Sequence, residues 1–255
     1  MRNVRTALAA LGAAVLLAGC PSLPGISGNQ TLEPKVLAIT SSDDRGITTS
    51  YVDLSWAGVT NAATYQISCK VGDGESKPLR TIEKTEFTDN VNPNMTLTYV
   101  VQAFGANGEE MVTSSPKTIQ VLNATVGKPA NLTVDKKAST AGTAVTPDSS
   151  KPELSWDAAA GATGYYVTVN EVGDGSKTGR MVYSSITKTN TATVGTLSQP
   201  DLNIPGYTQI KGDGLVKGKN YYFSVTSIRA DVADLSKATA FDVKMGDAPA
   251  KISFF

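Results

Sequence analysis

Residues 51–56 read YVDLSW, in which the large apolar side chains of one face are separated by single residues. This period of two predicts a β-strand with one face in a core and the other in water. The same alternation occurs in TYQISC at 64–69 and in YYFSV at 221–225. No segment after the first 19 residues sustains a helical period, so we expect an all-β fold.

This stretch returns 100 residues further along the chain, because the Leu-Ser-Trp of residues 54–56 recurs at residues 154–156. Nine residues after each tryptophan comes a tyrosine in a new alternating strand, Tyr65 and Tyr165. The other matches are Val-Gly-Asp-Gly at 71–74 and 172–175, and Pro-x-x-Leu-x-Ile/Val at 34–39 and 129–134. Asp-Gly tolerates positive φ and favours a hairpin turn. The chain therefore contains two copies of one β unit.

Taken in order, these motifs resemble the fibronectin type III module, which has Pro-x-x-Leu-x-Val, Leu-x-Trp, Tyr-x-Val and a closing alternating strand. The closing strand reads YVVQA at 99–103 in the first copy and YYFSVTS at 221–227 in the second. The resemblance implies two tandem immunoglobulin-like (fibronectin type III) β-sandwiches of about 100 residues each. We assign the first domain to residues 32–122 and the second to residues 128–245.

The two copies depart from the family pattern in two places, a missing tyrosine in the first copy and an insertion in the second. The tyrosine that usually opens the F strand is Leu97 in the first copy, so that corner is expected to lack its hydroxyl hydrogen bond, whereas Tyr221 keeps it. The second copy is also 24 residues longer between strands C and F (Leu97 to Tyr221 is 124, against the repeat of 100). Most of this surplus is the insertion 196–217, TLSQPDLNIPGYTQIKGDGLVK.

The first 19 residues have the features of a signal peptide. Arg2 and Arg5 precede an uncharged run at 7–18, which is too short to span a bilayer and ends in Leu-Ala-Gly-Cys20. This ending resembles the bacterial lipobox, which implies cleavage before Cys20 and acylation of its thiol. An ordinary signal peptide with a structural Cys20 is the alternative. Residues 20–31 are rich in Pro, Gly and Ser and are expected to form a tether.

The membrane lipid is thus an expected partner, through acylated Cys20. Pro21 follows the cysteine, where Asp would commonly signal retention in the inner membrane. We therefore expect a lipid-anchored protein of the cell envelope, at the outer membrane or cell surface. Residues 246–255 are assigned to a C-terminal tail that adds an edge strand or docks on a partner.

The composition argues against catalysis and against nucleic acid as a partner. The chain has no His, and its 23 Lys and Arg balance 23 Asp and Glu. No nucleophile–base pair or phosphate-binding motif is recognisable, so no catalytic residue and no cofactor is predicted. The Gly-Asp-Gly triplets and paired carboxylates do not match a calcium-loop spacing, so no metal ligand is predicted either. A hydrolase using Lys or carboxylates is the disfavoured alternative.

Three residues that could carry chemistry are assigned to the cores. Cys69 lies on the same strand face as Tyr65, which indicates a small buried side chain. Trp56 and Trp156 occupy equivalent places in both copies, so packing is favoured over sugar stacking. Tyr207 in the insertion is the aromatic residue that could meet a sugar.

The insertion and the loop after the last long strand hold the candidate partner-binding residues. Ile204, Tyr207 and Ile210 make the insertion too apolar for a solvated loop, and Arg229 and Asp231 flank the next turn. The alternative for the insertion is an extra hairpin that covers a sheet edge. Arg-Ala-Asp at 229–231 has Ala where an integrin ligand has Gly, so integrin-like recognition is not expected.

We therefore expect a non-catalytic cell-envelope lipoprotein that presents two β-sandwich modules for protein binding, adhesion or assembly of an envelope complex. Its partner would be an envelope protein or a glycan. The alternative is a carbohydrate-binding or spacer component of a polysaccharide-acting system. These functional expectations rest on analogy of fold, which does not determine function.

Overall fold

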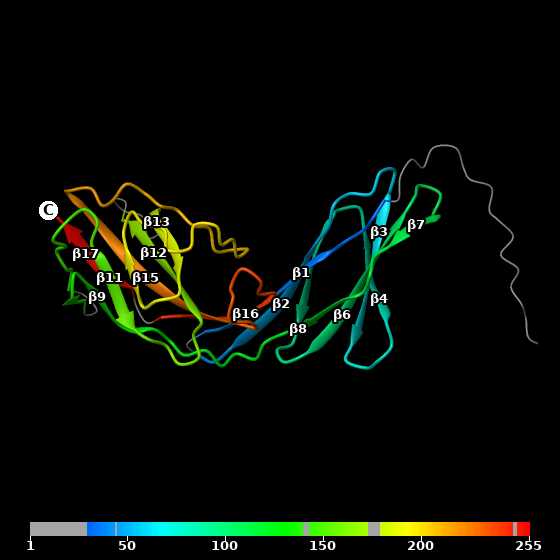
Figure 1. The fold of residues 1–255 in the computed structure, drawn as a ribbon, viewed down its shortest axis with the longest axis horizontal. Coiled ribbons are helices and arrows are strands. Elements are labelled where there is room, and N and C mark those ends of the chain that lie inside the picture. The colour runs from blue at the N-terminus through cyan, green and yellow to red at the C-terminus, as the bar shows by residue number, and fades with distance from the viewer. Residues whose placement is uncertain (1–29, 44, 140–142, 173–178, 247–248) are drawn as a thin grey trace, which may run out of the picture. The chain divides into compact units, whose positions relative to one another are not determined.

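The structure is a computed structural model that describes residues 30–43, 45–139, 143–172, 179–246 and 249–255. Across these ranges the chain forms strands, turns and loops, which confirms the all-β expectation (Figure 1). Within them there is no helix of the length and hydropathy needed to cross a bilayer. Thr31–Phe255 is one compact unit. Cys20, the signal peptide, nearly all of the tether and most of the predicted turn at 172–175 lie outside the described residues.

The first sandwich pairs two sheets in the strand order of the fibronectin type III fold. One sheet consists of β1 (Lys35–Ser42), β2 (Thr48–Ser55) and β5 (Glu86–Val91). The other consists of β4 (Lys77–Ile82), β3 (Thr64–Val71) and β6 (Thr96–Phe104), with β7 (Glu110–Thr113) and β8 (Lys117–Gln120) along the far edge of β6.

The second sandwich repeats this arrangement. One sheet has the order β10 (Lys137–Ala138), β9 (Ala130–Val134), β11 (Glu153–Asp157), β14 (Thr191–Thr193). The facing strands are β13 (Arg180–Thr187), β12 (Gly164–Glu171) and β15 (Lys219–Ala230), with β16 (Ala240–Met245) and β17 (Ala250–Phe254) each pairing with part of β15. The expected two tandem sandwiches are therefore present.

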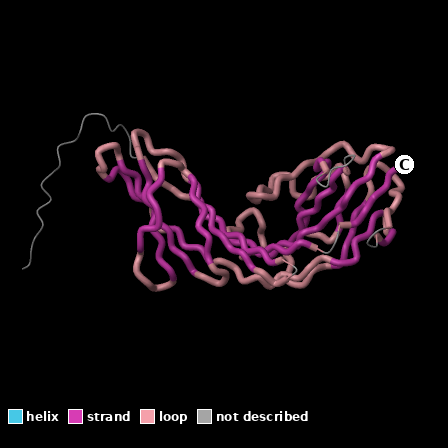
Figure 2. The backbone as a smooth tube through the Cα atoms, turned by 180° about the vertical axis from the view of Figure 1, so that it is seen from behind, coloured by secondary structure: helices cyan, strands magenta, loops and turns pink. Residues whose placement is uncertain are grey.

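The two sandwiches share one sheet, which the repeat pattern did not predict. β16 pairs with the end of β15 on one side and, in parallel, with β1 on the other, in a register that sets Ala38 opposite Ala240. Strands of both sandwiches thereby join an eight-stranded sheet, which can be followed from one sandwich into the other in Figure 2. The pairing satisfies backbone groups that would otherwise remain open along an edge of β1 and of β16.

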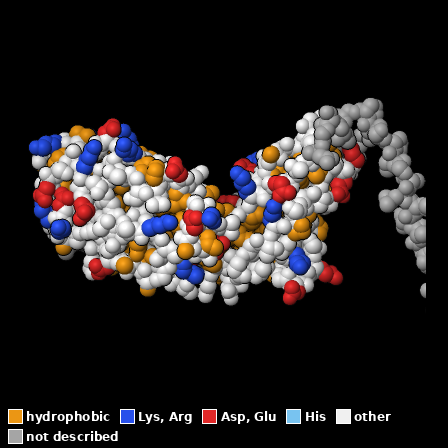
Figure 3. Space-filling model, in the orientation of Figure 1, with side chains coloured by type: hydrophobic (Ala, Val, Ile, Leu, Met, Phe, Trp, Pro, Cys, Tyr) orange, Lys and Arg blue, Asp and Glu red, His pale blue; other side chains and the backbone are white. Residues whose placement is uncertain are grey.

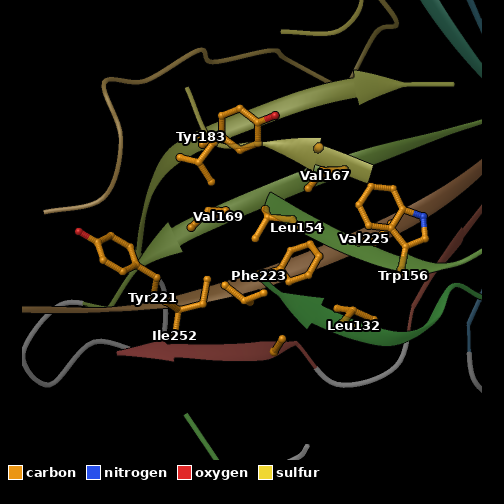
Figure 4. Packing of buried hydrophobic residues seen from close by; sticks show 14 of the residues in the cluster. Leu132, Leu154, Trp156, Val167, Val169, Tyr183, Tyr221, Phe223, Val225 and Ile252 are labelled. Carbon is orange, nitrogen blue, oxygen red and sulfur yellow. The ribbon is translucent and has the colours of Figure 1, made fainter. Parts of the chain in front are cut away.

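The two cores are built alike, as the repeated tryptophans predict. Trp56 packs edge-on against Tyr65 with 5.4 Å between ring centroids, and Trp156 packs against Tyr165 at 5.3 Å. Each tyrosine hydroxyl accepts a backbone N–H six residues upstream, at 2.8 Å in both copies. Figure 4 shows Trp156 among the buried strand residues of the second core. The core assignment of both tryptophans is confirmed.

The closing strands also behave as the family pattern implies. The Tyr221 hydroxyl accepts the N–H of Val216 at 2.8 Å and lies 3.2 Å from the carbonyl of the same residue. Leu97, its counterpart in the first copy, is buried and has no hydroxyl to offer. The hydrogen-bonded corner is therefore present in the second sandwich and absent from the first at this position.

The chain end corrects the assignment of a separate C-terminal tail. Residues 250–254 form β17, which pairs with β15, and the side chains of Ile252 and Phe254 are buried in the second core. Val145 forms a parallel bridge with Ile252 on the other side of β17. Of the two alternatives for 246–255, the added strand is correct for this segment, and the second sandwich is incomplete without it.

Candidate functional site

Four of the five predicted partner-binding residues lie at the junction between the two sandwiches, but not on one surface, and Ile210 lies at the edge of β13. Side chains alternate between the two faces of the shared sheet. Ile204 and Tyr207 pack against one face, whereas Arg229 lies on the other. Asp231 lies in the loop between β15 and β16.

A third hydrophobic core lies on the face of the shared sheet that is turned away from both sandwich cores. Ile39 of β1 alternates with Ala38 of the first core, and Tyr166 of β12 alternates with Tyr165 of the second. The buried strand residues of this third core are Ile39, Tyr166, Ile186, Ile228, Ala230, Phe241 and Val243. They come from both sandwiches, so burying them stabilises the junction.

The insertion supplies the cover of this third core. Leu202 and Ile204 are buried there, together with Leu235 from the loop between β15 and β16. Ile210 bridges to Ser184 at the edge of β13, with backbone hydrogen bonds of 2.8 and 2.9 Å. The insertion thus pairs with the edge of β13, in agreement with the alternative of a segment that covers a sheet edge. It also covers the face of the shared sheet that carries the third core. Ile204 is only 2% exposed, so it is not available for direct contact with a partner.

Tyr207 packs edge-on against Tyr166, with 5.1 Å between ring centroids. The Tyr166 hydroxyl donates to the carbonyl of Thr208 at 2.8 Å, which holds this part of the insertion on β12. Burial, with smaller contributions from Tyr51 and Tyr166, raises the pKa of the Tyr207 hydroxyl to about 12. Tyr207 is therefore a half-buried member of the cover rather than a free platform for a sugar ring.

The opposite face of the junction is polar, and the linker between the sandwiches lies across it. Asp242 is fully buried and its Oδ2 accepts the N–H groups of Thr125 at 2.7 Å and Val126 at 2.8 Å. Arg229 places its Nη2 3.2 Å from the same oxygen. One buried carboxylate thus connects β16, β15 and the linker.

Further hydrogen bonds fix the linker along its length. Thr40 donates to the carbonyl of Leu122 at 2.8 Å, and Arg229 donates to that of Asn123. Ser227 donates to the carbonyl of Gly127. Because sheet side chains satisfy the backbone groups of the linker, 122–127 is a fitted segment and not a free hinge.

The Arg-Ala-Asp segment is engaged within the chain. Asp231 accepts the N–H of Thr239 at 3.1 Å and its hydroxyl at 3.0 Å, which closes the loop that carries Leu235. Arg229 is committed to Asp242 and to the linker. Both residues therefore shape the junction.

Sequence reasoning missed Asp242 and Thr40, which are both fully buried. Asp242 interrupts the apolar run Ala-Phe-Asp-Val at 240–243 of β16, and a lone carboxylate inside such a run is a signal that could have been used. Nothing comparable marks Thr40, because threonine is a common strand residue.

Cys69 matches its core assignment. It is 6% exposed, and burial raises the pKa of its thiol, with Asp89 adding to the effect. The described part of the chain contains no group of three or more His, Cys, Asp or Glu side chains arranged to hold a metal ion. On the face drawn in Figure 3, basic and acidic side chains are interspersed among the described residues.

No protein-family model matches the sequence, and no curated protein matches it. Among solved structures, a segment of two fibronectin type III domains from chicken tenascin is similar over 87% of this chain and 95% of that chain, with 14% identity and a TM-score of 0.27. A chain of a cytokine receptor complex is similar over 86% of this chain and 96% of that chain, with 15% identity and a TM-score of 0.33. The fold assignment rests on the strand order and register described above.

Proposed function

We propose that this protein is a non-catalytic, lipid-anchored scaffold of the cell envelope, which holds two β-sandwiches in a fixed relation for binding to another envelope protein. The observation that carries the proposal is the parallel pairing of β1 with β16, covered by the third core on one face and by the linker on the other. A junction secured on both faces suits a scaffold or spacer better than a flexible tether.

The anchor is supported by the residues of the amino terminus and is tested separately. Cells expressing the wild type or the Cys20→Ser variant are labelled with tritiated palmitate. We expect label on the wild type alone, with the variant released from the membrane fraction. Equal labelling of the two forms would contradict acylation at Cys20.

The scaffold role is tested by cross-linking in native envelopes. The insertion cannot simply be deleted, because its loss would expose Ile186 and Phe241 of the third core to water. Point variants disturb less of the chain. Asp242→Ala loosens the linker, and Glu83→Ala changes an exposed carboxylate away from the junction. We expect a specific protein partner that is recovered with wild type and with Glu83→Ala, and at lower yield with Asp242→Ala. Retention on cell-wall glycans without a protein partner would support the carbohydrate-binding alternative instead.

A further inference from the structure

The first sandwich has an open groove of about 620 Å³ at its β4–β5 side. Its apolar lining includes the buried Cys69 and Leu97 and the half-buried Met95. Val71 and Leu79, at the rim, are 52% and 43% exposed, so the apolar lining continues to the open edge of the groove. This combination marks a place where apolar surface is available to a ligand.

The second sandwich fills the corresponding place with its own side chain. Cys69 of the first copy is paired with Lys77 of β4, and the equivalent Val169 of the second copy is paired with Tyr183 of β13. Tyr183 is fully buried in the second core, and its hydroxyl donates to the carbonyl of Thr196 at 2.9 Å. The counterpart of Tyr183 in the first sandwich is Lys77, whose side chain is exposed. The first sandwich therefore lacks the aromatic ring that closes this side of the second sandwich.

The second sandwich also covers this side with the irregular segment 208–216 of its insertion. Ile210 bridges to the edge of β13, and Leu215 is buried in the second core. The cleft that remains beside this segment is about 280 Å³. In the first sandwich only residues 92–95 connect β5 to β6, and no described residue bridges to the outer edge of β4.

We propose that the groove of the first sandwich binds an extended segment of a partner protein, which bridges to the edge of β4 and inserts a large apolar side chain over Cys69 and Leu97. The segment 208–217 of this chain shows what such an occupant looks like. Pro78 removes one backbone donor from β4, so the pairing is short, as the single bridge at Ser184 is in the second sandwich.

The charges agree with this occupant. The groove is lined by Glu75, Asp89 and Lys77, a net charge of −1. The segment 208–217, TQIKGDGLVK, has two Lys and one Asp, a net charge of +1. A peptide with the same pattern would therefore meet complementary charge at the rim and apolar surface on the floor.

The test uses the purified full-length protein in detergent micelles and a fluorescein-labelled peptide of sequence TQIKGDGLVK, followed by fluorescence anisotropy. We expect saturable binding to the wild type. Leu79→Lys, which puts a charge at the exposed rim, should weaken binding at least about tenfold.

The matched control is Val232→Lys, which changes an apolar residue of similar exposure, 44%, in the loop between β15 and β16. It should bind the peptide like the wild type, and tryptophan fluorescence and thermal unfolding should show all forms folded. The proposal is overturned by an absence of saturable binding to the wild type, or by equal binding to Leu79→Lys. Binding of a fluorescent fatty acid in place of the peptide would also overturn it.

This inference deepens the proposed scaffold role by naming the kind of partner segment that the scaffold holds. The two can fail separately. If the peptide does not bind, the results of the palmitate labelling and of the envelope cross-linking are unaffected. Failure of those two experiments would leave a peptide-binding groove on a protein with another role.

Discussion

Arg229 and Asp242 are direct cross-strand partners in the β15–β16 pair, with their charged groups 3.2 Å apart. The carboxylate is fully buried, while 27% of the arginine side chain remains exposed. Because the same carboxylate oxygen also accepts two linker N–H groups, this pair connects the shared sheet to the linker. Stability of the junction should therefore depend on Asp242 more than on any exposed carboxylate.

We predict that Asp242→Ala lowers the free energy of unfolding by about 2–3 kcal/mol, because it leaves two backbone N–H groups and a guanidinium without their acceptor. Asp242→Asn should lose less, since it keeps an acceptor oxygen. Guanidinium chloride denaturation measures both. Glu83→Ala, at an exposed carboxylate between β4 and β5, is the control and should cost less than about 1 kcal/mol. A loss no larger than that of the control would show that Asp242 does not hold the linker.

We predict that Ile204→Ala destabilises the protein by about 3 kcal/mol, because it leaves a cavity in the third core. The exposed Ile210, 36% accessible, is the matched position in the same insertion, and Ile210→Ala should cost well below about 2 kcal/mol. Chemical denaturation again provides the measurement. Equal losses for the two variants would mean that the insertion does not form a core with the shared sheet.

Gly212 should not tolerate a side chain. Its φ is +64°, and a Cβ atom there would overlap the backbone carbonyl of Val182 in β13. Gly206 has a φ of +82° but open space around it. A side chain at Gly206 would therefore meet backbone strain alone, whereas one at Gly212 would meet both strain and steric overlap. Gly206→Ala is expected to cost about 1 kcal/mol and Gly212→Ala clearly more. Thermal unfolding of the two variants checks this order, and the reverse order would contradict the close approach of the insertion to β13.

Tyr207 should contribute to a loss of stability in alkali. Burial raises the pKa of its hydroxyl to about 12, from an ordinary value of 10.0. As the pH rises, the unfolded chain therefore releases this proton before the folded protein does. The protonated Tyr207 hydroxyl makes its full contribution to the free energy of unfolding below about pH 10, and this contribution is lost as the pH rises towards about 12. The shift corresponds to at most about 2.7 kcal/mol.

The Tyr207→Phe variant checks this prediction in unfolding experiments between about pH 9 and about pH 12. Its stability should decline less steeply than that of the wild type across this range. A decline remains, because burial also raises the pKa values of the Tyr51, Tyr99 and Tyr183 hydroxyls. Parallel curves for the two proteins would show that Tyr207 titrates alike in the folded and unfolded chain.

The candidate site was predictable in part. The apolar character of 196–217 indicated a segment that does not remain in solvent, and Ile204 and Leu202 are indeed buried. What the insertion covers could not be read locally, because the residues beneath it come from strands of both sandwiches. The partner-binding role of Ile204, Tyr207, Ile210, Arg229 and Asp231 remains a prediction, and their contacts within the chain point to a structural role for Ile204 and Arg229.

The sequence by itself determined the all-β class, the two copies of one sandwich and the place of Trp56, Trp156 and Cys69 in the cores. These features follow from period-two alternation and from Trp and Tyr at repeated spacings, which are local patterns. Only the tertiary structure decided that β1 pairs with β16 and that the first sandwich keeps an open groove where the second is filled. Pairing of two distant strand edges uses the backbone N–H and C=O groups, which do not depend on the type of side chain. No side-chain pattern therefore predicts this pairing. The groove likewise stays open because no described segment of the chain covers it beside Lys77. Which segments lie there depends on the path of the whole chain and not on the local sequence.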